Sequence, residues 1–507
     1  MPRLLVHFAR FGAYHRARLR AAAEALAPHG WEVLGLEIAS TDSTYAWAEV
    51  VHTTERDIGE PRVITAFPGR VYEQITAAEY RRVLHPLLDG LAPDAMAIAG
   101  WGSVDAGSCL WWCRRHEVRR IVMSETRHAD GRRVWWKEFL KSRIVRRFDA
   151  ALVGGKSHRD YLVKLGMRAD KIRFGYNVVD NGYFAEEADR WREAEGGRQG
   201  SGDRGQGPEM SAVAGGLTRG ETPRETAWRE TRQPLSAICD QQSTICDPRS
   251  TIHPYFLASN RFIERKNLAR LIEAYAGYIQ QAPISSLRSP IWDLCLLGDG
   301  ELKGALIAQC EALGLRVVEG APWETGEKVG SDGLGRTLTA PEGEMQLEGK
   351  CSGDSLASTV TDRRYSADHV PQTACRMPHA ACPKPPFVFF PGFRQIEELP
   401  RFYAHAGAFV HPALEEPWGL VINEALACGL PVLSSRNVGA AEELVLEGVN
   451  GLTFEPNDAS DILRCLRRLA ELTAGERHAM QRLSSQTLAE RCPVEIFGRS
   501  LAALLTL

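Results

Sequence analysis

The sequence lacks three features that would place the protein in other classes. It has no apolar run approaching the ~20 residues that a helix needs to cross a bilayer. The apolar part of MPRLLVHFARFG, at the N-terminus, is short and interrupted by Arg and His, which favours a buried strand over a signal peptide. The formal net charge of −3 leaves no overall basic field, which disfavours a nucleic-acid binder. We therefore expect a cytoplasmic protein that binds no nucleic acid.

Closely spaced cysteine pairs are absent as well. The twelve cysteines are scattered and include no CxxC pair. Cys109, Cys113 and His116 lie in the helical stretch SCLWWCRRH, but their spacing fits no usual zinc pattern. We interpret the two cysteines as small buried apolar residues, and we predict no metal site.

What the sequence does contain predicts more than one α/β domain. The chain has 507 residues, too many for one ordinary core, with 44% hydrophobic and 25% charged residues. Residues 1–184 alternate helical segments with the short apolar runs RLLVHFAR, WEVLGLEI, DAMAIAG, RRIVMSE and FDAALVGG. Such alternation is typical of βαβ units and predicts a parallel sheet.

Two stretches interrupt this rhythm. Residues 185–252 are polar and Gly-rich and contain a period-seven repeat, SAICDQQ followed by STICDPR and STI. Three copies of seven residues cannot build a solenoid, so we interpret the segment as a disordered insertion or linker. Residues 322–386 are rich in Gly, Ser, Thr and Pro without a sustained period, which predicts a second disordered insertion.

The α/β rhythm returns over residues 253–485, and a C-terminal helix within 486–507 is expected to return to the first domain. The predicted fold is therefore α/β, with two doubly wound domains that face each other across a cleft. In open sheets of this kind, ligands bind at the carboxyl ends of the strands.

The stretch EEPWGLVINEALACGLPVLSS, residues 415–435, carries the first candidate site. Pro417 and Gly419 predict a turn just before a helix, with Glu416 outside the helix start and Glu424 about one turn inside it. The amides of Gly419, Leu420 and Val421 would then point outward as an anion site suited to phosphate. Glu424 could accept from ribose hydroxyls and Glu416 could hold sugar hydroxyls. The alternative is that both are ordinary carboxylates at a helix start.

A second candidate site lies in SNRFIERKN. Arg261 and Lys266 fall between a predicted strand and helix, where they could neutralise a diphosphate leaving group. Asn267 is a candidate N-cap of that helix. The alternative is a solvated basic loop. In the first domain, Gly12 follows the first strand and could let a loop approach the donor phosphates.

These motifs together resemble the retaining GT-B glycosyltransferases of the glycosyl transferases group 1 family. EEPWGLVINEALACGLPVLSS resembles the E-x7-E signature of that family, with Glu416 and Glu424 as its two glutamates, and RFIERKN looks like its Arg-x4-Lys phosphate motif. LCLLGDGELKGAL, FFPGFRQIEELPRFYAHAGAFVHPA and IRFGYNVVDNGYF also resemble family segments. The resemblance implies transfer of a sugar, with retention, from a nucleotide sugar to an acceptor hydroxyl on a glycan, lipid or small molecule. It implies Glu416, Arg261 and Lys266 as catalytic residues, and neither metal nor other cofactor.

The first domain resembles the family more loosely. Many members place a His near the transferred sugar, and the comparable strand here ends in MSETRHAD. Ser124, Glu125 and His128 all remain candidates for that role, and the acceptor stays open.

Residues 131–148, GRRVWWKEFLKSRIVRRF, are basic and contain paired tryptophans. They could form a helix that lies on an anionic membrane surface as a peripheral contact. The favoured interpretation is a crossover helix that packs its aromatic face on the sheet.

Three other functions fit parts of the pattern. A nucleotide-sugar epimerase or a phosphorylase could use the same fold, and a catalytically inactive scaffold could bind the nucleotide sugar without releasing nucleotide. A nucleic-acid binder is the third, and the charge disfavours it.

Overall fold

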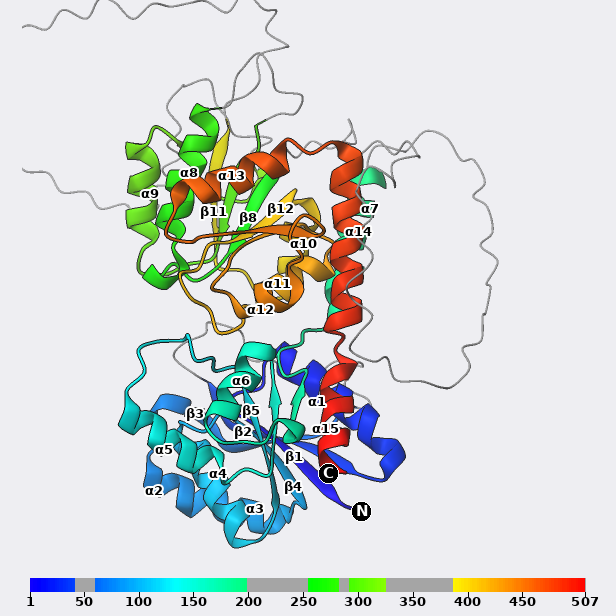
Figure 1. Ribbon diagram of the computed structural model, residues 1–507. Coiled ribbons are helices and arrows are strands. Elements are labelled where there is room, and N and C mark those ends of the chain that lie inside the picture. The colour runs from blue at the N-terminus through cyan, green and yellow to red at the C-terminus, as the bar shows by residue number, and fades with distance from the viewer. Residues whose placement is uncertain (42–59, 198–253, 282–290, 325–385, 507) are drawn as a thin grey trace, which may run out of the picture.

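The apolar runs predicted as strands form two separate parallel sheets. The computed structural model describes residues 1–41, 60–197, 254–281, 291–324 and 386–506. Within them the chain folds into two lobes, one above the other in Figure 1, and each lobe is built around one sheet. The two doubly wound domains expected from the sequence are confirmed.

The first sheet has seven parallel strands in the order β3-β2-β1-β4-β5-β6-β7. Its central strands are apolar on both faces because helices cover both sides, as parallel sheets require. The strands are β1 (Arg3–Phe8), β2 (Glu32–Thr41), β3 (Val63–Val71), β4 (Ala95–Ala99), β5 (Arg119–Ser124), β6 (Ala150–Val153) and β7 (Ile172–Phe174). The helices are α1 (Ala13–Leu26), α2 (Ala77–Glu79), α3 (His85–Leu91), α4 (Val104–Arg115), α5 (Trp135–Val145) and α6 (Lys156–Lys164).

The second sheet also has seven parallel strands, in the order β10-β11-β9-β8-β12-β13-β14. The strands are β8 (Tyr255–Ser259), β9 (Asp293–Leu297), β10 (Arg316–Val318), β11 (Phe387–Gly392), β12 (Ala408–His411), β13 (Val432–Ser435) and β14 (Gly451–Phe454). The helices are α8 (Leu268–Gln280), α9 (Lys303–Ala312), α10 (Leu399–His405), α11 (Leu420–Ala427), α12 (Gly439–Leu444) and α13 (Ala459–Ala470).

The first predicted boundary, after residue 184, is wrong because it cuts through a helix. Helix α7 (Asn181–Gly197) continues past that point and packs on α10 and α11 of the second domain. Arg192 donates from its guanidinium to the backbone carbonyls of Ala404 and Cys428. The polar composition of 185–197 did not indicate this docking. A few apolar residues on one face are enough to hold the helix on the second domain.

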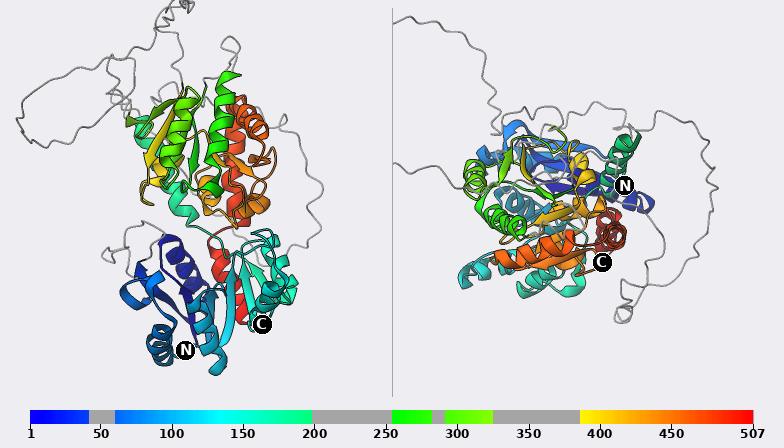
Figure 2. Two further views of the ribbon diagram at one scale, coloured as in Figure 1. Left: turned by 90° about the vertical axis from the view of Figure 1, so that its left-hand side faces the viewer. Right: turned by 90° about the horizontal axis from the view of Figure 1, so that it is seen from above.

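The chain returns to the first domain through two consecutive helices. Helix α14 (Ala474–Arg491) runs through the predicted boundary at 485 and packs on α11 and α12, so it belongs to the second domain. Helix α15 (Glu495–Leu505) then lies against α1 and β7 of the first domain. Figure 2 shows this crossing from the side, with both termini at the lower lobe.

Most of the two predicted insertions, including the period-seven repeat, lies outside the described residues. Residues 322–324, at one end of the second predicted insertion, form a turn after β10. The disorder expected of 185–197 is wrong, because α7 covers these residues, whereas for 198–252 and 325–385 it stays a prediction. No helix in the described ranges is long and apolar enough to span a membrane.

The favoured packing of the 131–148 segment is wrong. The aromatic residues of α5 do not rest on the sheet. Trp135, Trp136, Phe139 and Leu140 are 81%, 47%, 54% and 51% exposed, and within α5 only Val145 is fully buried.

Candidate active site

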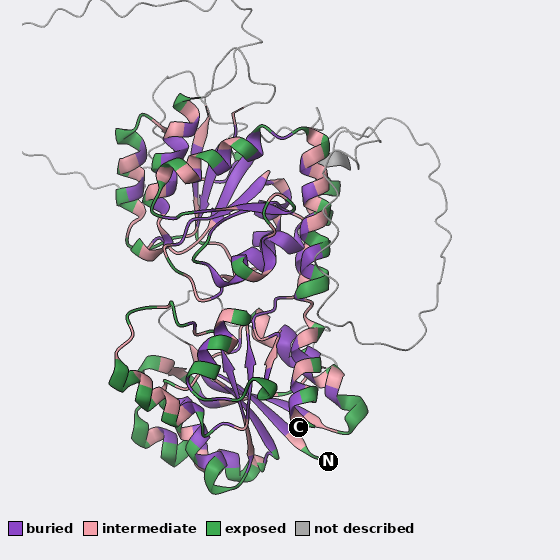
Figure 3. Ribbon diagram, viewed as in Figure 1, coloured by how far each residue is buried: buried purple, intermediate pink, exposed green. Residues whose placement is uncertain are grey.

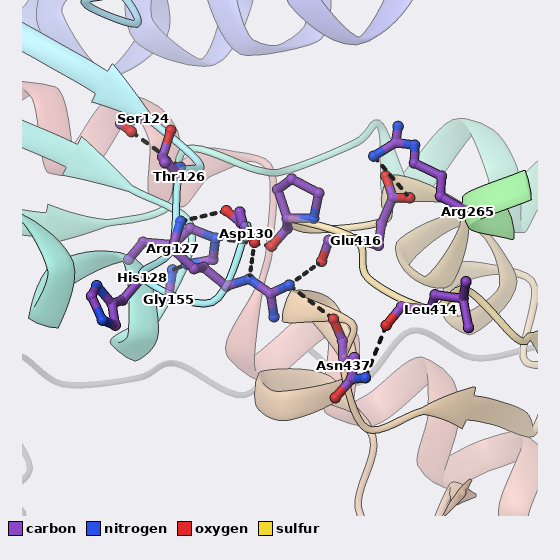
Figure 4. Close-up of polar contacts among 12 residues, drawn as sticks. Ser124, Thr126, Arg127, His128, Asp130, Gly155, Arg265, Leu414, Glu416 and Asn437 are labelled. Atoms are coloured by element: carbon purple, nitrogen blue, oxygen red, sulfur yellow. Dashed lines mark hydrogen bonds and ion pairs between the residues drawn. The ribbon is translucent and has the colours of Figure 1, made fainter. Parts of the chain in front are cut away.

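The two sequence motifs meet at one edge of the second sheet. Strands β8 and β12 are direct neighbours, so the loops that follow them share the carboxyl edge. Lys266 Nζ donates to Glu416 Oε2 at 2.6 Å, and Arg265 lies 3.9 Å from the same oxygen. Figure 4 shows Arg265 and Glu416 side by side at this edge. The structure thus brings together Glu416 and Lys266, which are 150 positions apart in the sequence.

This ion pair is largely shielded from water. The side chains of Lys266 and Glu416 are 10% and 14% exposed. Burial opposes the negative charge of Glu416, but Lys266 and Arg265 outweigh it and hold the pKa of Glu416 below its ordinary value. His411, at the end of β12, is buried beside the pair, and burial lowers its pKa to about 3. The imidazole is therefore neutral, and the charge at this edge is carried by Lys266, Arg265 and Glu416.

The turn before α11 has the shape that the sequence predicts. Gly419 is the N-cap of α11 with φ of 95°, a left-handed conformation that favours glycine. Its carbonyl accepts from Ile422, whereas the amides of Leu420 and Val421 have no acceptor within the helix, as at any helix start. A Cβ on Gly419 would come within 3.4 Å of Glu416 Cγ. The helix start therefore lies directly beside the carboxylate.

The loop that carries Arg261 packs against the Gly298-Asp299-Gly300 turn. Phe262 donates its amide to the carbonyl of Asp299. A Cβ on Gly298 would lie 1.9 Å from the Asn260 carbonyl oxygen, and one on Gly300 would lie 2.7 Å from that of Phe262. The glycines therefore allow the backbone under this loop to approach it closely. Arg261 itself is half-buried in that loop.

Asn267 is the N-cap residue of α8, as predicted, but its side chain does not cap the helix. Its own φ is 57°, in the left-handed region, and its side chain makes no capping bond. Instead, its Nδ2 donates to the carbonyls of Pro412 at 3.0 Å and Pro456 at 2.8 Å. Asn267 therefore links the Lys266 loop to the residues that follow β12. This link fixes the position of Lys266 relative to Glu416.

The first domain holds the Glu416 turn through an arginine that sequence reasoning missed. Arg127, in the loop after β5, is 5% exposed and pairs with Asp130. Its Nη2 donates across the domain interface to the carbonyls of Glu416 at 2.7 Å and Asn437 at 2.8 Å, as Figure 4 shows. The only sequence signal was a cation in the MSETRHAD loop, beside the residues considered for contact with the sugar.

A buried histidine binds the backbone of the next residue of the turn, Pro417. His158 accepts from the Gly155 amide at Nδ1, so its Nε2 carries the proton and donates to the Pro417 carbonyl at 3.0 Å. Trp418 packs closely against Gly154 of the first domain, because a Cβ on Gly154 would come within 2.8 Å of the Trp418 ring. Side chains from the first domain thus bind the backbone carbonyls of Glu416 and of the next residue, Pro417.

Glu424 does not face the cleft in this structure. It is 2% exposed, and its two carboxylate oxygens accept from Tyr14 at 2.9 Å and Tyr403 at 2.8 Å. Tyr14 belongs to α1 of the first domain, whereas Tyr403 belongs to α10 of the second. In this structure Glu424 therefore bridges the two domains, and its predicted contact with ribose hydroxyls stays a prediction.

The remaining first-domain candidates are spread over the interface. Gly12 caps α1 in an extended conformation that any residue adopts, and its amide donates to His15. Ser124 is buried, Glu125 accepts from Asn177, and His128 is exposed next to Lys164. His128 also lines a cavity of about 620 Å³ between the two domains. The structure brings none of the four into a hydrogen bond with Glu416 or Lys266.

The cysteines considered for metal binding lie in the core. Cys109 and Cys113 are fully buried among apolar side chains of the first domain. Within the described ranges no group of three or more His, Cys, Asp and Glu side chains is placed to hold a metal ion.

Comparison with solved structures defines the fold class. HepE from Anabaena, in complex with UDP and glucose, superposes with a TM-score of 0.55 at 14% identity, with all of both chains covered. Sucrose-phosphate synthase from Thermosynechococcus elongatus gives a TM-score of 0.55 at 14% identity and covers all of this chain and 98% of that one. At such identities the likeness shows the fold alone, and that fold is GT-B.

Comparison of sequences finds a family likeness on the segment that carries the Glu416 motif. Residues 381–486 match the family described as glycosyl transferases group 1, as the sequence motifs indicated. A probable sucrose-phosphate synthase from Oryza sativa is 40% identical over 86 residues, which is 16% of this chain and 8% of that protein. O-antigen chain mannosyltransferase B from Escherichia coli is 45% identical over 71 residues, 14% of this chain and 18% of that protein. The matches thus span less than a fifth of either relative.

Proposed function

We propose that the protein is a retaining glycosyltransferase that moves a sugar from a nucleotide-diphosphate sugar to an acceptor hydroxyl. The observation that carries this proposal is the ion pair of Lys266 with Glu416 beside the start of α11. A cation, a carboxylate and the first amides of a helix lie together at the carboxyl edge of a parallel sheet. That is where a ligand binds in this class of fold.

The proposed chemistry is stabilisation of the leaving group. As the bond between the sugar and the diphosphate breaks, negative charge builds up on the diphosphate. Lys266, Arg261 and the amides of Leu420 and Val421 would stabilise that charge in a site from which water is largely excluded. Since fixed cations and a helix start do this, the proposed mechanism uses no metal ion.

Glu416 would position the sugar. Its pKa lies below the ordinary value, so the side chain is a carboxylate at neutral pH and accepts hydrogen bonds from sugar hydroxyls. Arg127 and His158 hold the backbone at Glu416 and Pro417 from the first domain. These contacts would keep the reacting carbon in place relative to an acceptor bound on the first domain.

The donor is proposed to carry UDP. HepE, which shares the fold, was solved with UDP and glucose and with UDP-glucose. The acceptor is proposed to enter the cavity between the domains, which is lined by Asp160, Tyr161 and Asn437 among others. Their polar side chains suit a ligand that carries hydroxyl groups.

The test is nucleotide release from a panel of UDP-, GDP- and ADP-sugars, with and without a crude mixture of lipid and oligosaccharide acceptors. We expect release from a UDP-sugar that increases with acceptor. Release that needs inorganic phosphate would indicate a phosphorylase, and conversion of the donor sugar without acceptor would indicate an epimerase. Tight binding of the donor without any release would contradict transfer and leave a scaffold.

A further inference from the structure

Helix α5 exposes its apolar side to solvent. Trp135, Trp136, Phe139 and Leu140 are each about half exposed or more, and they fall within six consecutive positions. At helical spacing Trp135 and Phe139 are one turn apart, as are Trp136 and Leu140. They therefore share one side of the helix, opposite the buried Val145. Single exposed apolar residues are common, but a cluster of this size marks an interaction site.

The cluster is surrounded by positive charge. Residues 131–148 contain seven Lys and Arg and a single acid, Glu138. Five of those cations are exposed, namely Arg132, Lys137, Arg143, Arg146 and Arg147. Two cations also contact the aromatic rings, with Lys137 5.4 Å from the Trp136 ring centre and Arg143 5.0 Å from that of Phe139. The face is therefore both apolar and basic.

The opposite side of α5 is firmly attached to the first domain. Glu138 accepts from Lys141 and from the Tyr161 hydroxyl, both at 2.9 Å. Ser142 donates to the Leu165 carbonyl at 2.6 Å, and Val145 is buried. The aromatic side is thus presented on a helix anchored to its domain. In Figure 1 α5 lies on the outer flank of the lower lobe, and Figure 3 colours much of it as exposed.

We propose that this face of α5 docks the protein on the surface of an anionic membrane. Tryptophan and phenylalanine insert at the boundary between headgroups and acyl chains, while lysine and arginine bind the anionic headgroups. A second copy of the chain is a poor occupant, because a symmetric contact would bring the two basic patches together. An anionic bilayer can bury the apolar side chains and bind the basic side chains at the same time.

Docking through α5 would bring the cavity between the domains close to the bilayer. Tyr161 donates its hydroxyl to Glu138 of α5 and also lines the cavity. An acceptor carried by a lipid could then enter the cavity from the membrane. The docking surface itself does not rest on the proposed glycosyl transfer, since it can be measured without donor or acceptor.

The experiment is cosedimentation of the full chain with vesicles of phosphatidylcholine, either alone or mixed with phosphatidylglycerol. We expect binding to the mixed vesicles that weakens with salt, and little binding to phosphatidylcholine alone. Trp135→Ser with Phe139→Ser should lower the partition coefficient at least about tenfold. Arg143→Glu with Arg147→Glu should lower it by at least about fivefold per cation removed.

Matched variants in the second domain serve as controls. Leu313→Ser with Val449→Ser replaces exposed apolar residues, and Arg468→Glu with Arg482→Glu reverses exposed cations. Both double variants should bind like the wild type. Absence of binding to the mixed vesicles, or equal losses in the control variants, would overturn the proposal. So would a dimer in sedimentation velocity that Trp135→Ser with Phe139→Ser converts to a monomer, because the face would then be a contact between two copies.

Discussion

At the residue scale, the Lys266–Glu416 pair unites two motifs that the sequence keeps apart. Each motif alone had an ordinary explanation, a basic loop or a carboxylate at a helix start. Their contact at 2.6 Å, shielded from water, favours a shared role over either of those explanations. Holding a cation against a carboxylate in a shielded pocket costs desolvation free energy, and surface residues with no role would not need to meet that cost. The structure brings the two motifs into contact, and their catalytic role stays a proposal.

Replacing either partner of this pair should remove most activity. We expect Glu416→Gln and Lys266→Ala each to lower kcat at least about 100-fold, because each removes a group that acts on the reacting sugar phosphate. The measurement is the rate of sugar transfer, with circular dichroism to confirm folding. Glu311→Gln is the matched control, since Glu311 is an exposed glutamate of α9 and does not line the cavity between the domains. Near-wild-type turnover in either site variant would remove it from the proposed mechanism.

Other residues of the site could not be predicted because their partners come from distant parts of the chain. The helix signal around Glu424 was correct, but nothing local indicated that Tyr14 and Tyr403 would occupy its two oxygens. Asn267 looked like a capping residue, and its actual acceptors follow β12 and β14. In both cases the local pattern was read correctly, and a long-range contact decided the role of the side chain.

At the scale of single elements, periodicity predicted where strands and helices lie better than which side of each is buried. The alternating apolar runs located most strands of both sheets, because buried parallel strands are apolar throughout. Helices α5 and α7 show the limit. The aromatic side of α5 faces solvent, and the polar α7 docks on the second domain. Which side of a helix is buried depends on the surfaces of the neighbouring elements. The sequence of the helix itself does not contain this information.

The packing of α15 on α1 depends on one glycine. A Cβ on Gly498 would lie 1.9 Å from the Ala21 carbonyl oxygen and 2.8 Å from the Ala25 Cβ, so the two helices touch at this position. Gly498→Ala should therefore force them apart and destabilise the protein by about 1–3 kcal/mol. The measurement is the midpoint of thermal unfolding.

Gly107→Ala provides the control for this packing argument. Gly107 also lies inside a helix, α4, but a Cβ there would meet no atom within 4 Å. Alanine at that position should raise the unfolding free energy by about 0.5–1 kcal/mol, because it restricts the unfolded chain. If both variants shifted the midpoint in the same direction, close packing at Gly498 would not be the cause.

At the scale of the whole molecule, two domains and a cleft were predictable, whereas the contacts that join the domains were not. The resemblance supplied the order of the domains and the edge where the motifs meet. Arg127 and His158 bind backbone carbonyls of the Glu416 turn from the other domain, and such contacts leave no pattern in the sequence. The bridge from Tyr14 through Glu424 to Tyr403 belongs to the same class. The site is therefore a property of the assembled domains.

The Glu424 bridge should make stability depend on pH. Burial raises the pKa of Glu424 to about 6, and the hydroxyls of Tyr14 and Tyr403 only partly oppose that shift. The folded protein thus holds this proton more tightly than the unfolded chain, whose carboxyl has the ordinary value of 4.5. The contribution of Glu424 to the free energy of unfolding is largest below pH 4.5. It falls by about 2 kcal/mol as the pH rises through about 6.

Glu424→Gln tests this dependence because its carboxamide stays neutral at every pH. We expect the denaturant midpoint of the wild type to fall relative to that of Glu424→Gln as the pH rises from 4.5 to 7, followed by tryptophan fluorescence. Glu476→Gln should show the opposite sign. Contacts with Thr473 lower the pKa of Glu476, so its contribution is present at neutral pH and is lost as the pH falls. Parallel curves for the wild type and Glu424→Gln would mean that the pKa of Glu424 is the same in the folded and unfolded protein, which would contradict the prediction.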